Sequence, residues 1–411
     1  MGLRLFCALR KLSAPHPDPS GAGPLGSCPS HVYCNNKEKT FLMATHPKKV
    51  IHIWGLSLIV IMALTIQSCE KNENAPSSPS AIETNKLLFS YYTLNGSSID
   101  GRGMQCDLTT NPYTLTTILP GALGLRINNA STEIIYYASP GVSIDIFRSS
   151  ISGAGVIDLT PDFANQYIDS SPEWSPNGEQ ILFIRYFKAN GKEALVKMNR
   201  DGSGIQILTD TTKIKGVVGG TWSPSGRSIA LCGIPVNSVS EKRLYTFDSS
   251  GANLYQCDSH TNAAIPIFSP DGSLIAYGNS SGLAVYNIAS KNVVPVTISG
   301  SRAISYGFAW KPNGTLMCGI RNTATSKYDL YVVTISSSVT SSVLATGFSE
   351  SFSAVSSPDG QSVAMLGIAS SDTSLSLYSV GANGSNFKKM KTVDDNKSAT
   401  TYPENGMFWL N

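Results

Sequence analysis

The 411-residue chain contains little histidine and little charge. It has five histidines, and only His260 lies after residue 69. This scarcity excludes a histidine-rich zinc site, and a serine–histidine–aspartate hydrolase could only be built on that one residue. No G-x-S-x-G motif accompanies it, so we interpret His260 as a solvated loop residue. Charged residues make up 14% of the chain and long helix-forming runs are missing, which favours β-structure.

The small net charge of +3 is unevenly distributed along the chain. Residues 1–68 carry seven basic and two acidic side chains, so residues 69–411 have a net charge of −2. A near-neutral, slightly acidic body provides no electrostatic basis for binding nucleic acid. We therefore expect no nucleic-acid partner.

The cysteines show no metal-binding or redox spacing. Cys106, Cys232, Cys257 and Cys318 contain no C-x-x-C pair among them, and the chain has no Asp-rich calcium loop. We expect no metal and no cofactor. Cys232 and Cys318 occupy comparable positions in apolar strands, which indicates buried free thiols. The alternative is a disulfide between Cys232 and Cys257 in an oxidising compartment.

One short apolar run indicates export. Lys48 and Lys49 precede the run 54–66, a basic and apolar pattern typical of a secretory signal and too short to span a membrane comfortably. The following "TIQSC" resembles a bacterial lipobox of the looser form found in Bacteroidota-like lipoproteins. That resemblance implies cleavage after Ser68 and lipidation of Cys69. The alternative is an uncleaved signal anchor, and both interpretations place the body outside the cytoplasm.

We predict four segments along the chain. Residues 1–42 fit neither a signal nor a folded domain, and we interpret them as a non-native upstream extension. Residues 43–68 are the predicted lipoprotein signal peptide, and 69–86 a flexible polar tether. Residues 87–411 are the predicted folded domain.

A short phrase recurs along the folded domain. "EWSPNG" at 173–178 is followed by an apolar strand, and related phrases begin near 221, 267, 309 and 355. Their prolines are 48, 46, 42 and 46 residues apart, a period that marks a propeller or solenoid. The repeated structural residues are Trp174, Pro176 and Gly178; Trp222, Pro224 and Gly226; Phe268, Pro270 and Gly272; Trp310, Pro312 and Gly314; Pro358 and Gly360; and, at the end of the chain, Trp409.

Each repeat predicts four short antiparallel strands. In 168–209, a strand ending at Trp174 is followed by the SPNG turn, by "QILFIR", by "ALVKMN", and by an Asp-Gly hairpin turn into "IQILT". Four strands in about 45 residues are typical of a β-propeller blade.

The number of second strands favours seven blades, with six as the alternative. Such strands occur near residues 88, 134, 181, 229, 274, 316 and 363. A degenerate copy at 127–139 aligns Ile127 with Trp174. The run 87–93 lacks an innermost strand before it, and 402–410 supplies one, with Trp409 in the position of Trp174. We therefore expect the C-terminal strand to close the ring.

The repeated phrase resembles the TolB-like, WD40-like (PD40) β-propeller repeat over about residues 87–411. Lys311 and Ser356 depart from it, replacing the Ser and the Trp of the phrase. The resemblance implies an all-β propeller found in periplasmic envelope components that bind proteins and in N-terminal domains of peptidases. We expect no appended hydrolase domain, and the fold alone does not decide among functions.

The loops that enter the innermost strands are the predicted partner-binding site. They carry aromatic, basic and acidic side chains suited to a protein or glycan: Tyr167, Asp169, Lys213, Lys215, Arg302, Tyr306, Phe352, Tyr402 and Glu404.

We expect a monomeric, non-catalytic, lipid-anchored binding module of the cell envelope, held at the outer membrane on its periplasmic or surface side. The alternatives are a polysaccharide lyase or hydrolase that uses channel-mouth carboxylates, and a purely architectural subunit. Two channel carboxylates about 5–10 Å apart would favour glycosidase chemistry.

Overall fold

The computed structural model describes residues 85–410, except for 96–97, 140, 142, 163–164, 281, 299–300, 337–338, 350–351 and 396–399; of residues 301–307, 400–403 and 405 it describes the backbone only. The predicted extension, signal peptide, lipidation site at Cys69 and nearly all of the tether lie outside the described residues. Within residues 85–410, no helix is long and apolar enough to cross a membrane.

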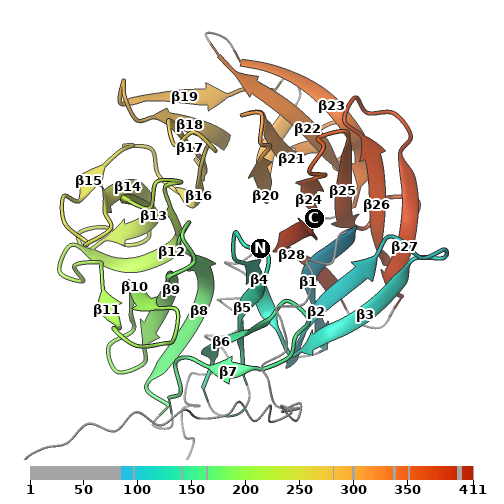
Figure 1. The fold of residues 1–411 in the computed structure, drawn as a ribbon. Helices are drawn as coiled ribbons and strands as arrows, with labels where there is room; N and C mark the ends of the chain where they lie inside the picture. The colour runs from blue at the N-terminus through green and yellow to red at the C-terminus, as the bar shows by residue number, and fades with distance from the viewer. Residues whose placement is uncertain are drawn as a thin grey trace, which may run out of the picture. The chain divides into compact units, whose positions relative to one another are not determined.

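The described residues form 28 β-strands in seven four-stranded antiparallel sheets, arranged around a ring (Figure 1). Each sheet is one blade, and its innermost strand borders the central channel. From the channel outward, the strands of blades 1 to 3 are β28 (Thr400–Leu410), β1 (Lys86–Asn95), β2 (Ser98–Asp107) and β3 (Thr114–Pro120); β4 (Leu123–Ile127), β5 (Glu133–Ala138), β6 (Asp145–Ser150) and β7 (Ile157–Asp158); β8 (Tyr167–Trp174), β9 (Gln180–Phe187), β10 (Lys192–Asn199) and β11 (Gln206–Ile207).

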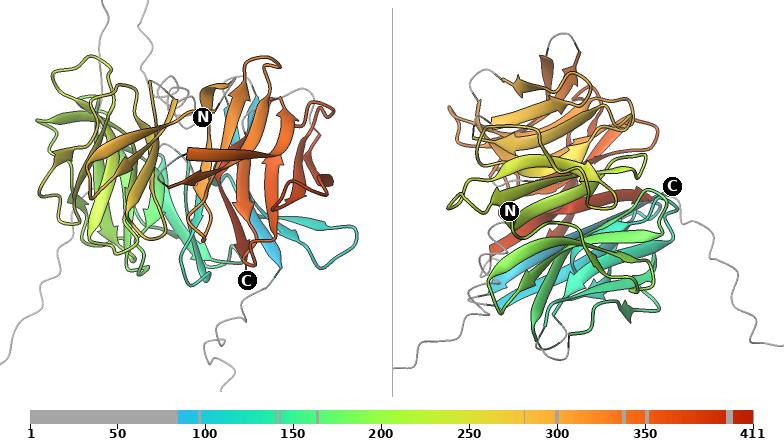
Figure 2. Two further views of the ribbon diagram at one scale, coloured as in Figure 1. Left: turned by 90° about the horizontal axis from the view of Figure 1, so that it is seen from above. Right: turned by 90° about the vertical axis from the view of Figure 1, so that its left-hand side faces the viewer.

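The other four blades repeat this order, and Figure 2 shows the ring from the side. Their strands are β12 (Ile214–Trp222), β13 (Ser228–Pro235), β14 (Arg243–Asp248) and β15 (Tyr255–Gln256); β16 (Ala264–Phe268), β17 (Leu274–Asn279), β18 (Gly282–Asn287) and β19 (Asn292–Val296); β20 (Ser301–Trp310), β21 (Leu316–Asn322), β22 (Tyr328–Ile335) and β23 (Val339–Phe348); β24 (Ser353–Ser356), β25 (Ser362–Gly367), β26 (Leu375–Gly381) and β27 (Lys388–Asp394). The prediction of seven blades is confirmed.

The second strand of each blade is apolar on both faces because it lies between two neighbouring blades. In β9, Ile181 and Phe183 belong to the hydrophobic cluster shared with blade 2. Leu182 and Ile184, which point to the other face, belong to the cluster shared with blade 4. A strand buried on both sides requires the continuous apolar run that the sequence contains.

The repeated phrase forms the turn between the first two strands of a blade. Ser175 Oγ donates to Asn177 Oδ1 at 2.7 Å and accepts a hydrogen bond from the backbone N–H of Gln180 at 2.9 Å. Gly178 has a φ of 74°, a conformation that suits glycine. Equivalent serine bonds occur at Ser269 and Ser357, so the phrase fixes the first hairpin of the blade.

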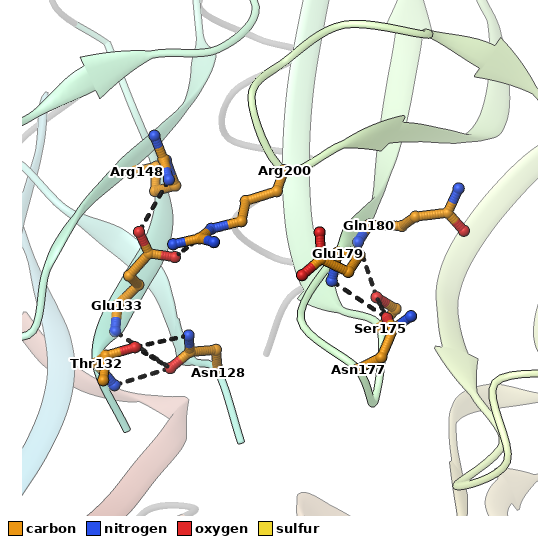
Figure 3. A network of polar contacts seen from close by, with 9 residues as sticks. All are labelled: Asn128, Thr132, Glu133, Arg148, Ser175, Asn177, Glu179, Gln180 and Arg200. Atoms are coloured by element: carbon orange, nitrogen blue, oxygen red, sulfur yellow. Dashed lines mark hydrogen bonds and ion pairs between the residues drawn. The ribbon is translucent and has the colours of Figure 1, made fainter. Parts of the chain in front are cut away.

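Blade 2 forms the same turn with a different residue. Asn128 takes the place of Ser175, and its Oδ1 accepts hydrogen bonds from the backbone N–H groups of Thr132 and Glu133, at 2.9 and 3.1 Å (Figure 3). The side-chain amide thus replaces the hydroxyl as the acceptor. This explains how the degenerate copy keeps its turn without Ser-Pro-Asp-Gly.

The aromatic residue before the turn packs between blades. Trp174 is buried in the cluster that joins blades 2 and 3, and Trp222 in the one that joins blades 3 and 4. Trp174 pairs with Ile181 across the hairpin, and Ile127 pairs with Ile134 in the same way. The alignment of the degenerate copy with the other repeats therefore matches the strand register.

The last strand closes the ring, as the sequence predicts. β28 pairs with β1 in antiparallel register, with Trp409 opposite Leu87. It also contacts both neighbouring blades. Ser353 Oγ, from blade 7, donates to the backbone oxygen of Glu404, and the Glu404 side chain is bonded to blade 2.

The four cysteines after residue 85 are buried and free, which confirms the interpretation as free thiols. Cys232 pairs with Leu244 of β14, and the backbone N–H of Cys257 donates to the oxygen of that same Leu244. One strand therefore separates the two cysteines. At about 4.8 Å per strand spacing, their Cα atoms are too far apart for the alternative disulfide, which needs less than about 7 Å.

Candidate functional site

A central cavity of about 710 Å³ lies inside the ring, and all seven innermost strands contribute residues to its wall. This volume is in the range of about 300–1,000 Å³ that small-molecule sites occupy. The cavity is the candidate site because it is the place where residues of every blade meet.

Bulges in the innermost strands shape the cavity wall. The pairing register shifts between Leu123 and Arg126 in β4, and between Ser170 and Glu173 in β8. A similar shift falls between Ala264 and Ile267 in β16. Five of the six residues released from pairing at these bulges line the cavity: Gly124, Ser171, Pro172, Ile265 and Pro266. Bulges redirect backbone and side chains in this way at barrel rims and next to active sites.

Two bulged residues have left-handed backbone conformations. Ser171 has a φ of 54° and Ile265 a φ of 50°, and both line the cavity. Gly124, at the bulge of β4, has a φ of 59° without a steric cost. For a β-branched residue such as Ile265 this conformation costs roughly 1–3 kcal/mol. Strain of this kind on a cavity wall is typical of functional sites.

Three charged residues line the cavity, each from a different one of three adjacent blades. They are Glu404 of β28, Arg126 of β4 and Glu173 of β8, and no other charged residue lines it within the described part of the chain. Both carboxylates interact electrostatically with Arg126. The guanidinium also donates to the backbone oxygen of Leu125 at 2.8 Å. Together these residues form the charged side of the cavity.

Each carboxylate is bonded to the backbone of the next blade. Glu404 Oε2 accepts from the N–H of Gly124 at 2.7 Å. Glu173 Oε1 accepts from Thr221 Oγ1 at 2.6 Å and from the N–H of Trp222 at 3.2 Å. Burial raises the pKa of both carboxyl groups, although these hydrogen bonds and Arg126 oppose the shift. The two glutamates hold adjacent innermost strands together.

The opposite side of the cavity is apolar. β16 contributes Ile265, Pro266 and Phe268, and β20 contributes Phe308 and Trp310. Figure 1 shows these two strands across the channel from β4. The phenyl rings and the indole are partly exposed, and the indole N–H of Trp310 donates to the oxygen of Ile267 at 3.3 Å. The cavity therefore has a charged side on blades 1 to 3 and an aromatic side on blades 5 and 6.

The predicted loop residues do not form one exposed site. Among those whose side chains are described, only Glu404 lines the cavity. Asp169 is 1% exposed and pairs with Arg185 through both carboxylate oxygens, at 2.8 and 2.6 Å. Tyr167 covers this pair, with the guanidinium carbon 4.5 Å from its ring centroid. Phe352 is buried against Phe348.

Two predicted basic residues lie near the start of β12. Lys213 is exposed and is 3.5 Å from Asp210, whereas Lys215 is partly exposed. The structure describes only the backbone at the other three predicted residues, Arg302, Tyr306 and Tyr402.

Sequence reasoning missed Arg126 and Glu173, although a signal for both was present. Glu173 directly precedes Trp174, and Arg126 directly precedes Ile127. Successive side chains of a strand point to opposite faces, so a residue beside the repeat position lies on the other face of its blade. The position before each repeat aromatic could therefore have been compared across the blades.

Outside the cavity, we examined the single histidine of the folded domain and the groups that could bind a metal ion. His260 is half-exposed, and its Nδ1 is 2.7 Å from the buried carboxylate of Asp258. In the described residues, no three histidine, cysteine or acidic side chains gather in a way that could hold a metal ion.

Comparison with known proteins finds solved structures of the same fold. No protein family and no curated protein matches the chain. Similar structures include TolB from Acinetobacter baumannii (14% identity, covering 82% of this chain and 87% of that one, TM-score 0.47). An oligogalacturonate lyase in complex with manganese has 11% identity, coverage of 72% and 85%, and a TM-score of 0.54.

The β-propeller domain of the Trilobed protease from Pyrococcus furiosus is also similar, with 12% identity, coverage of 77% and 94%, and a TM-score of 0.53. That domain is described as having an open velcro topology, whereas β28 closes the first blade of this chain. Identities this low show the fold alone. The chain is a seven-bladed β-propeller.

Proposed function

We propose that the protein is an extracytoplasmic binding module that takes its ligand in the central cavity and catalyses no reaction. The observation that carries the proposal is the cavity itself, with its charged side on blades 1 to 3 and its aromatic side on blades 5 and 6. A pocket of mostly apolar lining with a few convergent polar groups is the usual form of a ligand site.

The bonding of the two carboxylates supports binding over catalysis. A catalytic carboxyl group must change its proton or its bonds during the reaction. Glu404 and Glu173 each use an oxygen to hold the next innermost strand, through Gly124 and through Trp222. Groups that maintain the ring in this way are suited to orienting a ligand.

The cellular location is proposed from the sequence. The basic and apolar segments before Cys69 support export, and the lipobox resemblance supports anchoring through that cysteine. Metabolic labelling with a radioactive or clickable fatty acid should mark the wild-type protein and leave Cys69→Ala unmarked. Labelling that persists in the variant would refute the anchor.

The binding proposal is tested with two matched substitutions. Val218 lines the cavity, and Val239, 92% exposed, does not. The purified protein is screened by thermal shift against oligosaccharides and short peptides. Val218→Trp should abolish the stabilisation that a ligand produces, and Val239→Trp should preserve it. Equal stabilisation of both variants would contradict binding in the cavity.

A hydrolase or lyase is the second candidate, because two carboxyl groups with raised pKa values line the cavity beside Arg126. Incubation of the protein with polysaccharides and analysis of the products distinguishes the two functions. Cleavage by the wild type that is lost in Glu173→Gln would support catalysis and contradict the proposed function.

A further inference from the structure

The charges of the central cavity indicate the charge of its ligand. One guanidinium, Arg126, stands with two carboxyl groups, Glu173 and Glu404. An acidic ligand would meet both carboxylates in a site where burial strengthens electrostatic repulsion. A cationic ligand would meet Arg126. Hydroxyl groups both donate to carboxylates and accept from a guanidinium, so an uncharged polyol matches this mixed group of charges.

The aromatic side indicates the shape of the ligand. Phe268, Phe308 and Trp310 are partly exposed on strands that lie across the channel from Arg126. A ligand between the two sides needs hydroxyl groups along one edge and an apolar face on the other. A sugar ring has both, because its axial C–H groups form an apolar face that packs on aromatic rings.

The bulges argue against a peptide that pairs with an innermost strand as the fifth strand of a blade. Such a peptide requires a regular strand edge with backbone N–H groups. The pairing register of β8 and β16 shifts in mid-strand, and the residues released there include Pro172 and Pro266. Proline has no N–H to donate. Both residues line the cavity, so the wall lacks donors at the positions where a peptide would need them.

We propose that the central cavity binds a neutral saccharide, with Arg126 and Glu173 contacting hydroxyl groups and Phe308 and Trp310 contacting the apolar face of a sugar ring. This inference rests on the proposed binding function and specifies the class of ligand. It applies to soluble oligosaccharides and to the exposed ends of a polysaccharide, since both present the same rings.

Titration calorimetry of the purified protein tests the inference. The probes are neutral cello-, malto-, xylo- and manno-oligosaccharides, an oligogalacturonate as the acidic counterpart, and a set of neutral peptides of similar mass. At least one neutral saccharide should bind, and the oligogalacturonate should bind at least tenfold more weakly. Phe308→Leu and Glu173→Gln should each weaken saccharide binding about tenfold, whereas Val239→Trp should leave it unchanged.

A second readout is made first on the wild type. A sugar that packs on Trp310 should change the tryptophan fluorescence of the wild type, and the change should be lost in Trp310→Phe. If only oligogalacturonate or a peptide binds, and Val218→Trp blocks that binding, the saccharide inference is overturned and the binding function stands. If Val218→Trp blocks the binding of none of the probes, or if none of them binds, both proposals fail.

Discussion

The carboxylate of Glu404 accepts a 2.7 Å hydrogen bond from the backbone N–H of Gly124, a residue 280 positions earlier in the chain. This bond joins the last strand, β28, to the innermost strand of blade 2. Ser353 of blade 7 donates to the backbone oxygen of the same glutamate. The closing strand is therefore held by side-chain bonds to the blades on both sides as well as by its pairing with β1.

Gly406 should be intolerant of any side chain. Its φ is 155°, and a Cβ there would be 2.5 Å from the backbone oxygen of Leu125 and 2.6 Å from Arg126 Nη1. We expect Gly406→Ala to lower the free energy of unfolding by about 2–4 kcal/mol, as measured by urea denaturation. Gly360→Ala is the control, since its φ is 69° but no atom lies within 4 Å, so it should cost about 1 kcal/mol. Equal losses would contradict the close packing at β28.

Deletion of residues 403–411 tests ring closure directly. It removes most of the innermost strand of blade 1, including Trp409, which packs in the cluster shared by blades 1 and 7. The edge of β1 would then be unpaired. We expect no cooperative unfolding transition in circular dichroism. A truncated protein with the wild-type transition would show that β28 is dispensable.

Stability should fall with rising pH through the ionisation of Glu404. Burial raises its pKa above the ordinary value of 4.5. The unfolded chain has the ordinary pKa and the folded protein the raised one. At pH values between the two, the folded state binds more protons than the unfolded chain, so the free energy of unfolding falls as pH rises. Glu404→Gln keeps an oxygen acceptor for Gly124 but cannot ionise. The free energy of unfolding of this variant should therefore fall less with rising pH than that of the wild type.

The control for this pH dependence has the opposite sign. The hydrogen bond from Ser357 lowers the pKa of Asp359, so this carboxylate contributes stability that is lost as pH falls. Asp359→Asn should therefore be less stable than the wild type at neutral pH, and the two proteins should become similar in stability in acid. Urea midpoints from pH 2 to 8 measure both effects, because the contribution of Asp359 is lost below its ordinary pKa of 3.8. Parallel curves for the wild type and Glu404→Gln would exclude the predicted ionisation.

Asn128 should be essential to the turn of blade 2. Its side chain accepts two backbone hydrogen bonds, from Thr132 and Glu133 (Figure 3). Asn128→Ala leaves both donors without this acceptor and should cost about 1–2 kcal/mol in thermal or urea unfolding. Asn128→Ser should recover part of the loss, because Ser175 performs the same role in blade 3. No difference between Ala and Ser would argue against side-chain capping.

Glu133 links blades 2 and 3 through two arginines. Its carboxylate oxygens are each 2.8 Å from a guanidinium nitrogen, one of Arg148 in its own blade and one of Arg200 in blade 3 (Figure 3). Arg200 is 43% exposed, so Arg200→Ala should cost under about 1 kcal/mol and less at high salt. Glu133→Ala should cost more, about 1–3 kcal/mol, because Arg148 is largely buried. A double-mutant cycle measures the coupling, and zero coupling would refute the link.

The buried thiols should be unreactive in the folded protein. Burial raises the pKa of Cys106 to about 11 and that of Cys318 to about 12, and the thiolate is the reactive form. At pH 8, N-ethylmaleimide should modify neither residue, nor Cys232 and Cys257, until denaturant is added. Mass spectrometry of each cysteine peptide, without reductant, measures the modification. A Cys232–Cys257 peptide pair would contradict the strand order of blade 4.

Much of the fold could be predicted because the turns require particular residues. Pro176, Gly178 and their equivalents mark hairpins whose geometry few other residues adopt, and their spacing gives the blade length. Trp409 identified the closing strand because it shares the position of Trp174. Blade 2 was harder to recognise, since Asn128 forms the same turn with different chemistry.

The cavity could not be predicted in the same way. Its wall depends on bulges in the innermost strands, and the period-two pattern of a strand does not mark such shifts in register. Asp169 and Phe352 were predicted to contact a partner because of their position near loops, but both are buried. Both precede or begin innermost strands, but Arg185 neutralises the first and Phe348 covers the second. Arg185 lies opposite Asp169 in the β8–β9 hairpin, and Phe348 is four residues before Phe352, so both contacts depend on strand register and not on loop position.

Blade 1 also determines the order in which the protein can fold. Its strands β1 to β3 are synthesised first, yet their innermost partner is β28, at residues 400–410. Until those residues leave the ribosome or the export channel, β1 has an unpaired edge and the ring remains open. The intermediate is therefore at risk of aggregation for nearly the whole time of synthesis.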